Sequence, residues 1–281
     1  MMPRFRQVTI VGLGLIGGSV GMAARRRRLA RTVVGLSRSR ATVRRARARG
    51  VIDWGTTDPV RAVRDADLVV LATPVDQLVP QALRLARAMR PGSVLTDAGS
   101  TKSELVAALN RRLPGAISFV GAHPVAGSEQ RGIEAAQPGL LEGSCCVLTP
   151  TARTDRRALA AVRRFWTGLG MRVMTMSPSR HDRALAGGSH VVHLIAYALA
   201  GSVAPGLPQM PRSFAEMTRI ARSEPDLWDD IFFSNRAEVL RTLGAFSREL
   251  EGLRRMLSRG DRPSLRRRLA RAKRRRDALE D

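Results

Sequence analysis

The fold is decided by residues 8–19, which read VTIVGLGLIGGS. Residues 8–11 are a short apolar run typical of a strand, and a helical stretch that ends at residues 25–28 follows the glycines. The glycines between them match the pattern G-x-G-x-x-G. Strand, glycine turn and helix in this order are the context in which the pattern indicates a dinucleotide site. A tight strand–helix turn without a ligand is the alternative.

Each glycine of this pattern has a separate physical role. Gly12 permits the tight turn, Gly14 lets the backbone approach a pyrophosphate, and Gly17 lets the helix pack closely on the strand. The helix N-terminus presents free backbone N–H groups, which assigns Leu15 and Ile16 to phosphate binding as well. We therefore predict that residues 12–17 bind a dinucleotide cofactor.

The residues after the second strand predict which cofactor binds. NAD sites usually place an acidic residue there, about 20 residues past the glycines, where it bonds the ribose hydroxyl. Here the strand predicted over residues 32–36 is followed by Ser37, Arg38, Ser39 and Arg40, and no acidic residue occurs before Asp53. A hydroxyl and a guanidinium can both bind a phosphate. The pattern predicts NADP, bound through Ser37, Arg38 and Arg40, and leaves NAD possible.

Strand and helix patterns alternate through the first part of the chain, which predicts an α/β Rossmann-type domain with a parallel sheet covered on both faces. Because ligands bind at the carboxyl ends of such strands, Thr73 and Ser100 are assigned to the cofactor. Further strands are predicted at residues 67–72, 93–96, 118–121, 145–148 and 171–176, with helices at 38–49 and 75–89.

The pattern changes after Ser177, where only helices are predicted. They cover residues 178–203, 214–222, 227–257 and 262–281, with a glycine–proline loop at 201–211. We therefore divide the chain into a dinucleotide-binding domain, residues 1–177, and an all-α domain, residues 178–281. The long apolar helical faces predict a homodimer through the second domain.

Composition excludes several classes of protein. The net charge of +24 invites a nucleic-acid function, but the positive charge is almost entirely arginine, spread along the whole chain; the lysines are Lys102 and Lys273. No dedicated nucleic-acid partner is therefore expected.

The adjacent Cys145 and Cys146 have neither metal-ligand spacing nor distant partners. The glycines argue against a signal peptide over residues 8–24, and no other stretch is expected to approach membrane-spanning length. We therefore expect a cytoplasmic protein.

Several separated segments resemble one family, the prephenate and arogenate dehydrogenases. They read DAGSTKS at 97–103, GAHPVAGSE at 121–129, SHVVHLIAYAL at 189–199 and TRIARSEPDLWDDI at 218–231. The resemblance implies a Rossmann domain, a helical dimerisation domain, and oxidative decarboxylation of a cyclohexadienol with hydride transfer to NAD(P), which leads to tyrosine. Prephenate and arogenate both remain open as substrates.

The resemblance also implies the residues of the active site. His123, expected at the carboxyl end of a strand with Pro124 stiffening the turn, would accept the proton of the substrate hydroxyl. Ser100 would contact this hydroxyl and the nicotinamide. Its alternative role is an N-cap for the helix that starts at Thr101, and it could do both. Arg219 would bind a substrate carboxylate.

Other pocket residues follow from the same resemblance. His190 and His193 share one helix face and would line the substrate pocket. His181 and Asp182 are the nearby candidates for a metal site, which we do not expect. Glu129, Asp182, Glu216 and Trp228 match positions near the pocket, with surface ion pairs or core packing as the alternative.

Two other classes of protein also have a Rossmann domain. β-Hydroxyacid dehydrogenases use a catalytic lysine on the first interdomain helix, and this chain has no lysine between Lys102 and Lys273. A cofactor-binding Rossmann module that regulates or binds nucleic acid without turnover would not need His123, Ser100 and Arg219 together.

Overall fold

The structure is a computed structural model that describes residues 5–126, 130–203 and 211–279. Contacts between residues divide the chain into two compact units, Met1–Arg236 and Ala237–Asp281. The first unit contains both sheets and helices α1 to α10, and the second contains helices α11 and α12.

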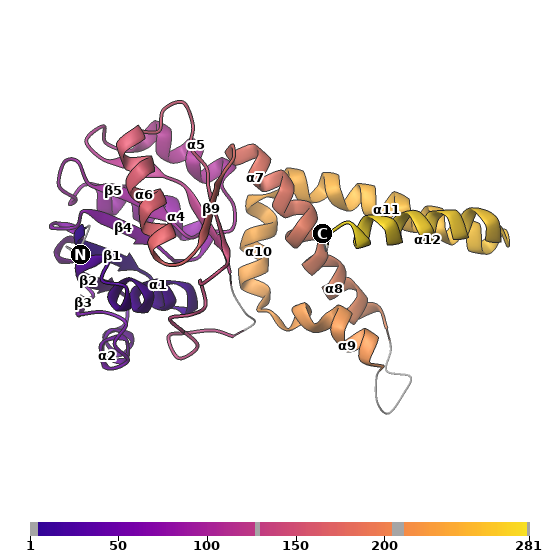
Figure 1. The fold of residues 1–281 in the computed structure, drawn as a ribbon, viewed down its shortest axis with the longest axis horizontal. Helices are drawn as coiled ribbons and strands as arrows, with labels where there is room; N and C mark the ends of the chain where they lie inside the picture. The colour runs from indigo at the N-terminus through magenta and orange to yellow at the C-terminus, as the bar shows by residue number, and fades with distance from the viewer. Residues whose placement is uncertain (1–4, 127–129, 204–210, 280–281) are drawn as a thin grey trace. The chain divides into compact units, whose positions relative to one another are not determined.

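The larger sheet has six parallel strands in the order β3-β2-β1-β4-β5-β6. This is the strand order of the dinucleotide-binding Rossmann fold, so the predicted fold class is confirmed (Figure 1). The strands are β1 (Phe5–Val11), β2 (Ala30–Leu36), β3 (Trp54–Thr56), β4 (Leu68–Leu71), β5 (Val94–Asp97) and β6 (Ser118–Val120).

Helices cover both faces of this sheet, as its apolar strands require. In β4, Leu68 and Val70 belong to one buried cluster, while Val69 and Leu71 belong to another. The first cluster includes residues of α1, α2 and α6, and the second includes residues of α3, α4 and α5. These helices are α1 (Leu15–Arg26), α2 (Arg40–Ala48), α3 (Pro59–Val63), α4 (Val75–Ala86), α5 (Ser103–Arg112) and α6 (Arg156–Gly168).

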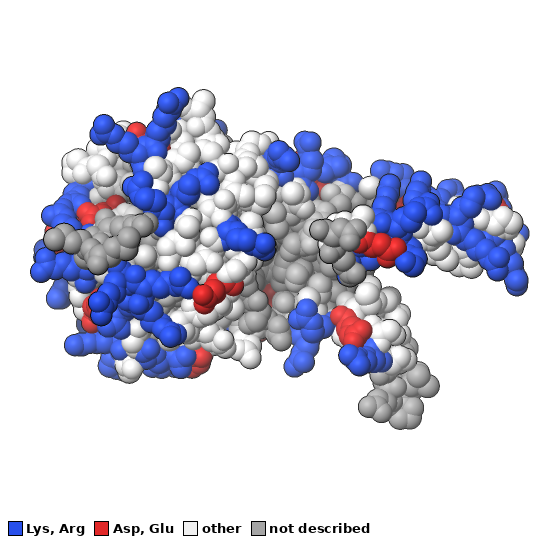
Figure 2. All heavy atoms as spheres, viewed as in Figure 1, with Lys and Arg blue, Asp and Glu red and all other residues white. Residues whose placement is uncertain are grey.

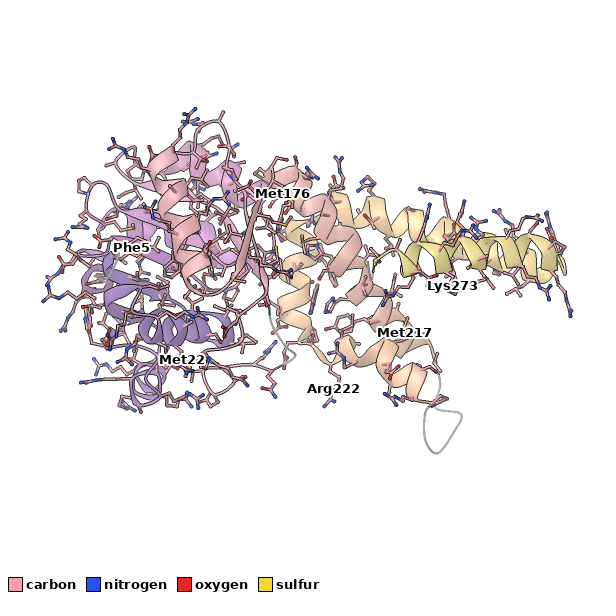
Figure 3. The ribbon with its side chains drawn as sticks, in the orientation of Figure 1. Phe5, Met22, Met176, Met217, Arg222 and Lys273 are labelled. Carbon is pink, nitrogen blue, oxygen red and sulfur yellow. The ribbon has the colours of Figure 1, made fainter. Side chains whose placement is uncertain are left out.

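Aromatic packing closes the first cluster. Phe5, labelled in Figure 3, contacts Phe165 of α6 edge to face, with ring centroids 6.0 Å apart. Phe165 in turn contacts Trp166, and both are almost completely buried. The start of β1 is thereby fixed to the last helix before β9.

A second, smaller sheet was only partly predicted. It has the order β7-β8-β9, in which β7 (Ala122–Val125) is antiparallel to β8 (Cys145–Leu148), and β8 is parallel to β9 (Arg172–Thr175). Strand β7 was not predicted because its four residues contain a proline. Pro124 lies on the edge strand, where a missing N–H is tolerated. The expectation that Pro124 stiffens a turn is therefore wrong. Strand β3, of three residues, was also missed.

The helices that follow are interrupted more often than their periodicity indicated. The pattern over residues 178–203 is α7 (Pro178–Leu185), a π-helical turn at Ala186–His190, and α8 (Val191–Ser202). The next helix is α9 (Arg212–Thr218), which continues into a 3₁₀ turn, Arg219–Arg222. The pattern over residues 227–257 is divided at Asn235 into α10 (Pro225–Ser234) and α11 (Arg236–Ser258). The last helix is α12 (Arg262–Asp277). No strand occurs after β9 among the described residues.

One helix of the described residues, Pro178–Ser202, is long and apolar enough to cross a membrane by length and composition alone. The expectation that no stretch reaches this length was wrong. Its polar residues His181, Asp182 and His190 are buried in hydrogen-bonded positions.

Positive charge is distributed over the molecule. In Figure 2, Lys and Arg side chains are scattered over the visible face of the first unit and also cover α11 and α12. In the second unit, Arg268 of α12 forms a two-bond ion pair with Glu249 of α11, at 2.6 Å for each bond. This pair joins the two helices of the hairpin.

Candidate active site

A cavity of about 1060 Å³ lies within the first unit, at the carboxyl ends of β1, β4 and β5. Gly14, Thr73 and Ser100, which follow these strands, form one wall. The cavity is also lined by residues of the segments after β9, which are Ser189, His190, His193, Arg219, Ser223, Trp228 and Ile231. The cavity therefore lies where the Rossmann fold binds its ligands.

The glycine turn is shaped to receive a dinucleotide. Gly12 has a φ of +92°, which favours glycine, and a Cβ on Gly17 would lie 1.9 Å from the carbonyl oxygen of Gly12. A Cβ on Gly14 would meet nothing within 4 Å, and Gly14 caps α1 without a side chain. Open space thus lies over the first turn of α1, where Leu15 and Ile16 line the cavity. A diphosphate fits this place because helix N-termini attract anions.

The end of β2 has no acidic residue at the expected position. Ser37 follows the last residue of β2 directly, and its Oγ accepts a bond from the backbone N–H of Ser39 at 3.3 Å. Arg38 and Arg40 are exposed, and none of Ser37, Arg38 and Arg40 lines the cavity. The carboxylate of Asp53 accepts hydrogen bonds from the side chain of Arg25 and from the backbone N–H of Val33, which lies within β2 and not at its end.

Ser100 lies in the cavity wall and does not cap a helix. Helix α5 begins at Ser103, and its N-cap residue is Lys102, which makes no side-chain cap. The carboxylate of Asp182 replaces this cap, because it accepts bonds from the backbone N–H groups of Lys102 at 2.8 Å and Ser103 at 2.7 Å. The alternative role of Ser100 as a cap is therefore wrong.

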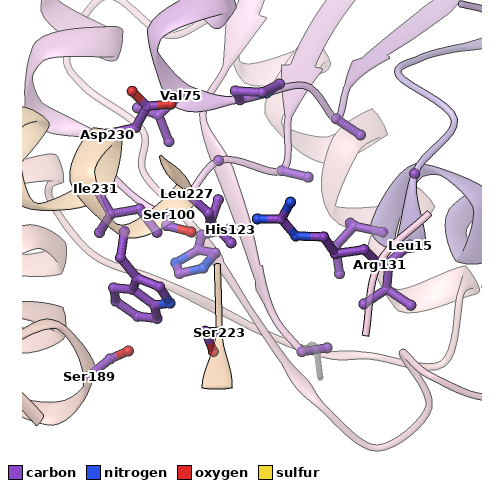
Figure 4. A pocket seen from close by; sticks show the side chains of 18 of the residues that line it. Leu15, Val75, Ser100, His123, Arg131, Ser189, Ser223, Leu227, Asp230 and Ile231 are labelled. Atoms are coloured by element: carbon purple, nitrogen blue, oxygen red, sulfur yellow. The ribbon is translucent and has the colours of Figure 1, made fainter. Parts of the chain in front are cut away.

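His123 lies within β7, opposite Val147, rather than in a turn. In Figure 4 its ring and the Ser100 hydroxyl project into the same part of the cavity, while Arg131 and Leu15 lie together elsewhere in its wall. Burial, followed by Coulombic interactions with His181, Lys102 and His190, holds the pKa of His123 well below its usual value. The imidazole is therefore neutral near pH 7 and can accept a proton.

A buried ion pair explains the DAGSTKS segment. The side chains of Asp97 and Lys102 are completely buried and bonded to each other. The Asp97 carboxylate also accepts the N–H of Gly99 at 2.8 Å and that of Ala122 at 2.9 Å. Asp97 thereby joins the end of β5, the loop that carries Ser100, and the strand that carries His123.

His190 is held by an amide that was not predicted. The Asn235 side-chain N–H₂ group donates to the backbone oxygen of Asp182 at 2.8 Å and contacts Nδ1 of His190 at 3.1 Å. Since an N–H₂ group only donates, Nδ1 of His190 accepts, and Nε2 carries the proton. Nε2 is buried and has no partner among the described residues. Burial lowers the pKa of His190 to about 4, so this ring is a neutral donor.

His193 and Trp228 form a stacked pair, with ring centroids 3.5 Å apart. Nδ1 of His193 bonds the backbone oxygen of Ser189 at 3.0 Å, which leaves Nε2 as its acceptor. Burial, the largest cause, and Arg219 lower the pKa of His193, although the bond to Ser189 opposes them. His193, Trp228 and Arg219 line the cavity, so the predicted substrate residues are brought together.

The other assigned residues have mixed positions. Glu129 lies outside the described residues. Glu216 is exposed on α9, is paired with Arg212 at 2.7 Å, and does not line the cavity. Thr73 lines the cavity, and its hydroxyl contacts Gln81 at 3.3 Å. Among the described residues, no group of three or more His, Cys, Asp or Glu could hold a metal ion.

Three further residues were missed. Arg131 lines the cavity and pairs with Glu224 at 3.2 Å, but no pattern distinguishes one arginine from the many others. His181, which the sequence offers only as a candidate metal ligand, lies behind His123. Asn235 ends α10, where its polar side chain inside an apolar helical pattern was the available signal.

Fold and site together define a Rossmann-fold enzyme of the dinucleotide-binding class. The carboxyl ends of the sheet offer the glycine cradle, and the helices that follow β9 bring histidines and an arginine to the same cavity.

Comparison with known proteins identifies the family. Residues 20–175 match the family model for the prephenate dehydrogenase nucleotide-binding domain, and residues 177–271 match that for its dimerization domain. The chain belongs to the prephenate dehydrogenase family, which confirms the resemblance found in the sequence.

Individual relatives span nearly the whole chain. A cyclohexadienyl dehydrogenase of Zymomonas mobilis is 37% identical over 258 residues, covering 89% of this chain and 88% of the relative. The structure of prephenate dehydrogenase from A. aeolicus with hydroxyphenyl propionate and NAD+ is 33% identical, with a TM-score of 0.90 over 98% of each chain. Synechocystis arogenate dehydrogenase is 28% identical, with a TM-score of 0.83 over 97% of this chain and 99% of that one.

Proposed function

We propose that this enzyme oxidatively decarboxylates prephenate, arogenate or both, with transfer of a hydride to a nicotinamide cofactor, in the synthesis of tyrosine. The observation that carries the proposal is the neutral His123 ring, which lines the same cavity as Ser100 and the glycine cradle. Family membership supports it, and so do the activities named for the relatives.

His123 holds the proton that the reaction displaces. A nicotinamide held at the glycine turn would supply the acceptor for the hydride of the ring carbon that bears the hydroxyl group. As that carbon becomes a carbonyl, His123 accepts the hydroxyl proton. The bond to the ring carboxylate then breaks, its electron pair enters the ring, and carbon dioxide leaves. The proton returns from His123 to the oxygen, and the product is a phenol.

The remaining side chains bind and orient the substrate. Arg219 binds a substrate carboxylate, for which the guanidinium fork is suited. His190 donates its Nε2 proton to a substrate oxygen, because that donor has no partner among the described residues. Trp228 and His193 form an aromatic wall beside the ring, and Ser100 binds the hydroxyl from the side of the cofactor.

The test replaces His123 with asparagine. Loss of a general base typically costs about 10²–10⁴-fold in rate, so His123→Asn should lower kcat by this amount while the Kd of the cofactor, measured by fluorescence titration, stays within twofold. Ser93→Ala is the control, because it removes a buried hydrogen bond to Ala66 outside the cavity. A kcat for His123→Asn within threefold of wild type would remove His123 from the mechanism. Absence of turnover by wild type with either substrate would overturn the proposed function.

We also propose that NADP is preferred over NAD. The end of β2 lacks the carboxylate that would repel a 2′-phosphate, and Ser37, Arg38 and Arg40 offer donors to it. Because each charged hydrogen bond contributes about 1.5–3 kcal/mol, kcat/KM should be at least about tenfold higher with NADP. Ser37→Asp should reverse this preference. Ser39→Asp, which keeps an oxygen cap on α2 and adds the same charge two residues on, should change it less. A wild-type preference for NAD contradicts the proposal.

We further infer a cytoplasmic homodimer with a domain boundary near residue 177. The boundary between the two matched family models supports this division. Exposed apolar side chains on the predicted helical domain, such as Val192 and Phe233, offer a surface for a second copy. The free thiols of Cys145 and Cys146 fit a reducing compartment. Light scattering should give twice the chain mass of 30.7 kDa, and a monomer at micromolar concentration contradicts the dimer.

A further inference from the structure

Behind His123, on the side away from the cavity, lies a second histidine. Nδ1 of His123 and Nε2 of His181 are 2.8 Å apart, and the ring centroids are 5.1 Å apart in an edge-to-face arrangement. His123 is on β7 and His181 is on α7, so the contact joins segments far apart in the chain. His181 is completely buried and does not line the cavity. It has no route to contact a substrate there.

Asp182 fixes the other side of the His181 ring. Its Oδ1 is 2.8 Å from Nδ1 of His181 and also accepts the N–H of Lys102, while its Oδ2 accepts the N–H of Ser103. Burial alone raises the pKa of Asp182, but the hydrogen bonds from His181, Ser103 and Lys102 together outweigh it and lower the pKa below its usual value. The N-terminus of α5 also favours a negative charge at this place. Asp182 is therefore an ionised group that only accepts hydrogen bonds.

The protons of both rings follow from this acceptor. Since Asp182 can only accept, Nδ1 of His181 carries a proton, and Nε2 of a neutral His181 carries a lone pair. That lone pair accepts a hydrogen bond from the Nδ1–H group of His123. A neutral imidazole has one N–H, so Nε2 of His123 is left as an acceptor. Nε2 is also the ring nitrogen that remains for the cavity, because Nδ1 is engaged with His181.

We propose that His181, itself oriented by Asp182, is a positioning residue that holds His123 in the one tautomer able to accept a proton from the substrate. This inference rests on the proposed function, in which His123 is the proton acceptor. When His123 takes the proton, its bond to His181 becomes a charge-assisted bond, which is stronger than the neutral one. His181 therefore stabilises the protonated acceptor at the moment when the hydride leaves.

Two variants separate this role from simple packing. His181→Leu fills the space and removes both nitrogens, while His181→Gln places an amide oxygen near the former Nε2 and can still accept from His123. His181→Leu should lower kcat about 10–150-fold, the value of one charge-assisted bond, with substrate KM within twofold. His181→Gln should recover most of the lost kcat. Ser93→Ala controls for loss of a buried hydrogen bond elsewhere and should leave kcat unchanged.

A second measurement reads the tautomer directly. The chain has four histidines, so nitrogen NMR of protein labelled with ¹⁵N-histidine can resolve every ring. Wild type should show His123 protonated at Nδ1 and His190 protonated at Nε2. In His181→Leu, the His123 signals should change to the other tautomer or to a mixture. Circular dichroism identifies a variant that fails to fold. In that case the tautomer of His123 in the wild-type protein tests the positioning role by itself.

The outcomes distinguish this inference from the proposed function. If wild type turns over substrate but His123 is protonated at Nε2, or if His181→Leu retains both kcat and tautomer, the positioning role is wrong. If wild type turns over neither prephenate nor arogenate, the proposed function fails, and the tautomer measurement still tests the hydrogen-bond chain.

Discussion

The buried pair Asp97–Lys102 allows a quantitative prediction about stability. Both side chains are completely buried. In Lys102→Met, an apolar side chain replaces the ammonium group, and the Asp97 carboxylate retains its bonds to the N–H groups of Gly99 and Ala122. These neutral donors cannot balance its charge. Removal of one partner from a buried pair costs about 3–5 kcal/mol.

This cost can be expressed as a change in melting temperature. For a unit of 150–250 residues, 1 kcal/mol corresponds to about 2–4 °C. Lys102→Met should therefore lower the Tm by about 6–20 °C, measured by differential scanning fluorimetry at pH 7 without ligand. Asp97→Asn combined with Lys102→Met should recover part of the loss, because the unpaired charge is then absent.

The chain supplies its own control, since its other lysine is exposed. Lys273 pairs with Asp277 one turn along α12, and its side chain is 76% exposed. Such pairs contribute little, so Lys273→Met should change the Tm by no more than about 2 °C. If Lys102→Met melts within 3 °C of wild type, or no lower than Lys273→Met, the pair does not stabilise the fold as argued.

Three further predictions concern the site. Gly17→Ala should abolish cofactor binding in a fluorescence titration, because its Cβ would lie 1.9 Å from the Gly12 oxygen; an unchanged Kd would contradict the close packing. Asn235→Leu leaves the buried Nδ1 of His190 unpaired, while the backbone oxygen of Asp182 keeps the N–H of Ala186, and should lower the free energy of unfolding in urea by about 1–3 kcal/mol; a loss below 0.5 kcal/mol would count against this network. The free energy of unfolding should also fall as the pH decreases from about 6.5 to about 4, because His190 takes up a proton at a higher pH in the unfolded protein than in the folded protein, where its pKa is about 4. His190→Leu should weaken this pH dependence, and an equal dependence in the variant and wild type would refute the argument.

Much of the sheet was predictable, because its strands are short apolar runs between glycines and helical patterns. The glycine motif predicted the first turn of α1 correctly because Gly12 has a positive φ and Gly17 packs on the carbonyl oxygen of Gly12, five residues earlier. Strand β7 was not predictable in this way, since it contains a proline and its pairing with β8 joins residues 20 to 26 positions apart. The break at Asn235 was missed because apolar residues continue on both sides of it.

The site was predicted less completely than the fold. The resemblance identified His123, Ser100 and Arg219, all of which line the cavity. It did not reveal the side chains behind them, because a buried polar residue is recognised only once its partner is in place. Lys102 was nevertheless signalled: in a chain that uses arginine almost everywhere, one internal lysine indicates a place where a planar guanidinium does not fit.

The π-helical turn at Ala186–His190 fixes the angle between two halves of one helix. Such a turn holds one residue more than an α-helical turn, and each residue of a helix advances by about 100°. Removal of Gly188 would restore a regular helix and rotate everything beyond it by about that angle. His190 and His193 would then turn away from the wall they share, while His181 and Asp182 stayed in place. The orientation of His190 and His193 relative to His181 and Asp182 thus depends on the length of this segment. Deletion of a single codon would change that orientation without altering any of these four side chains.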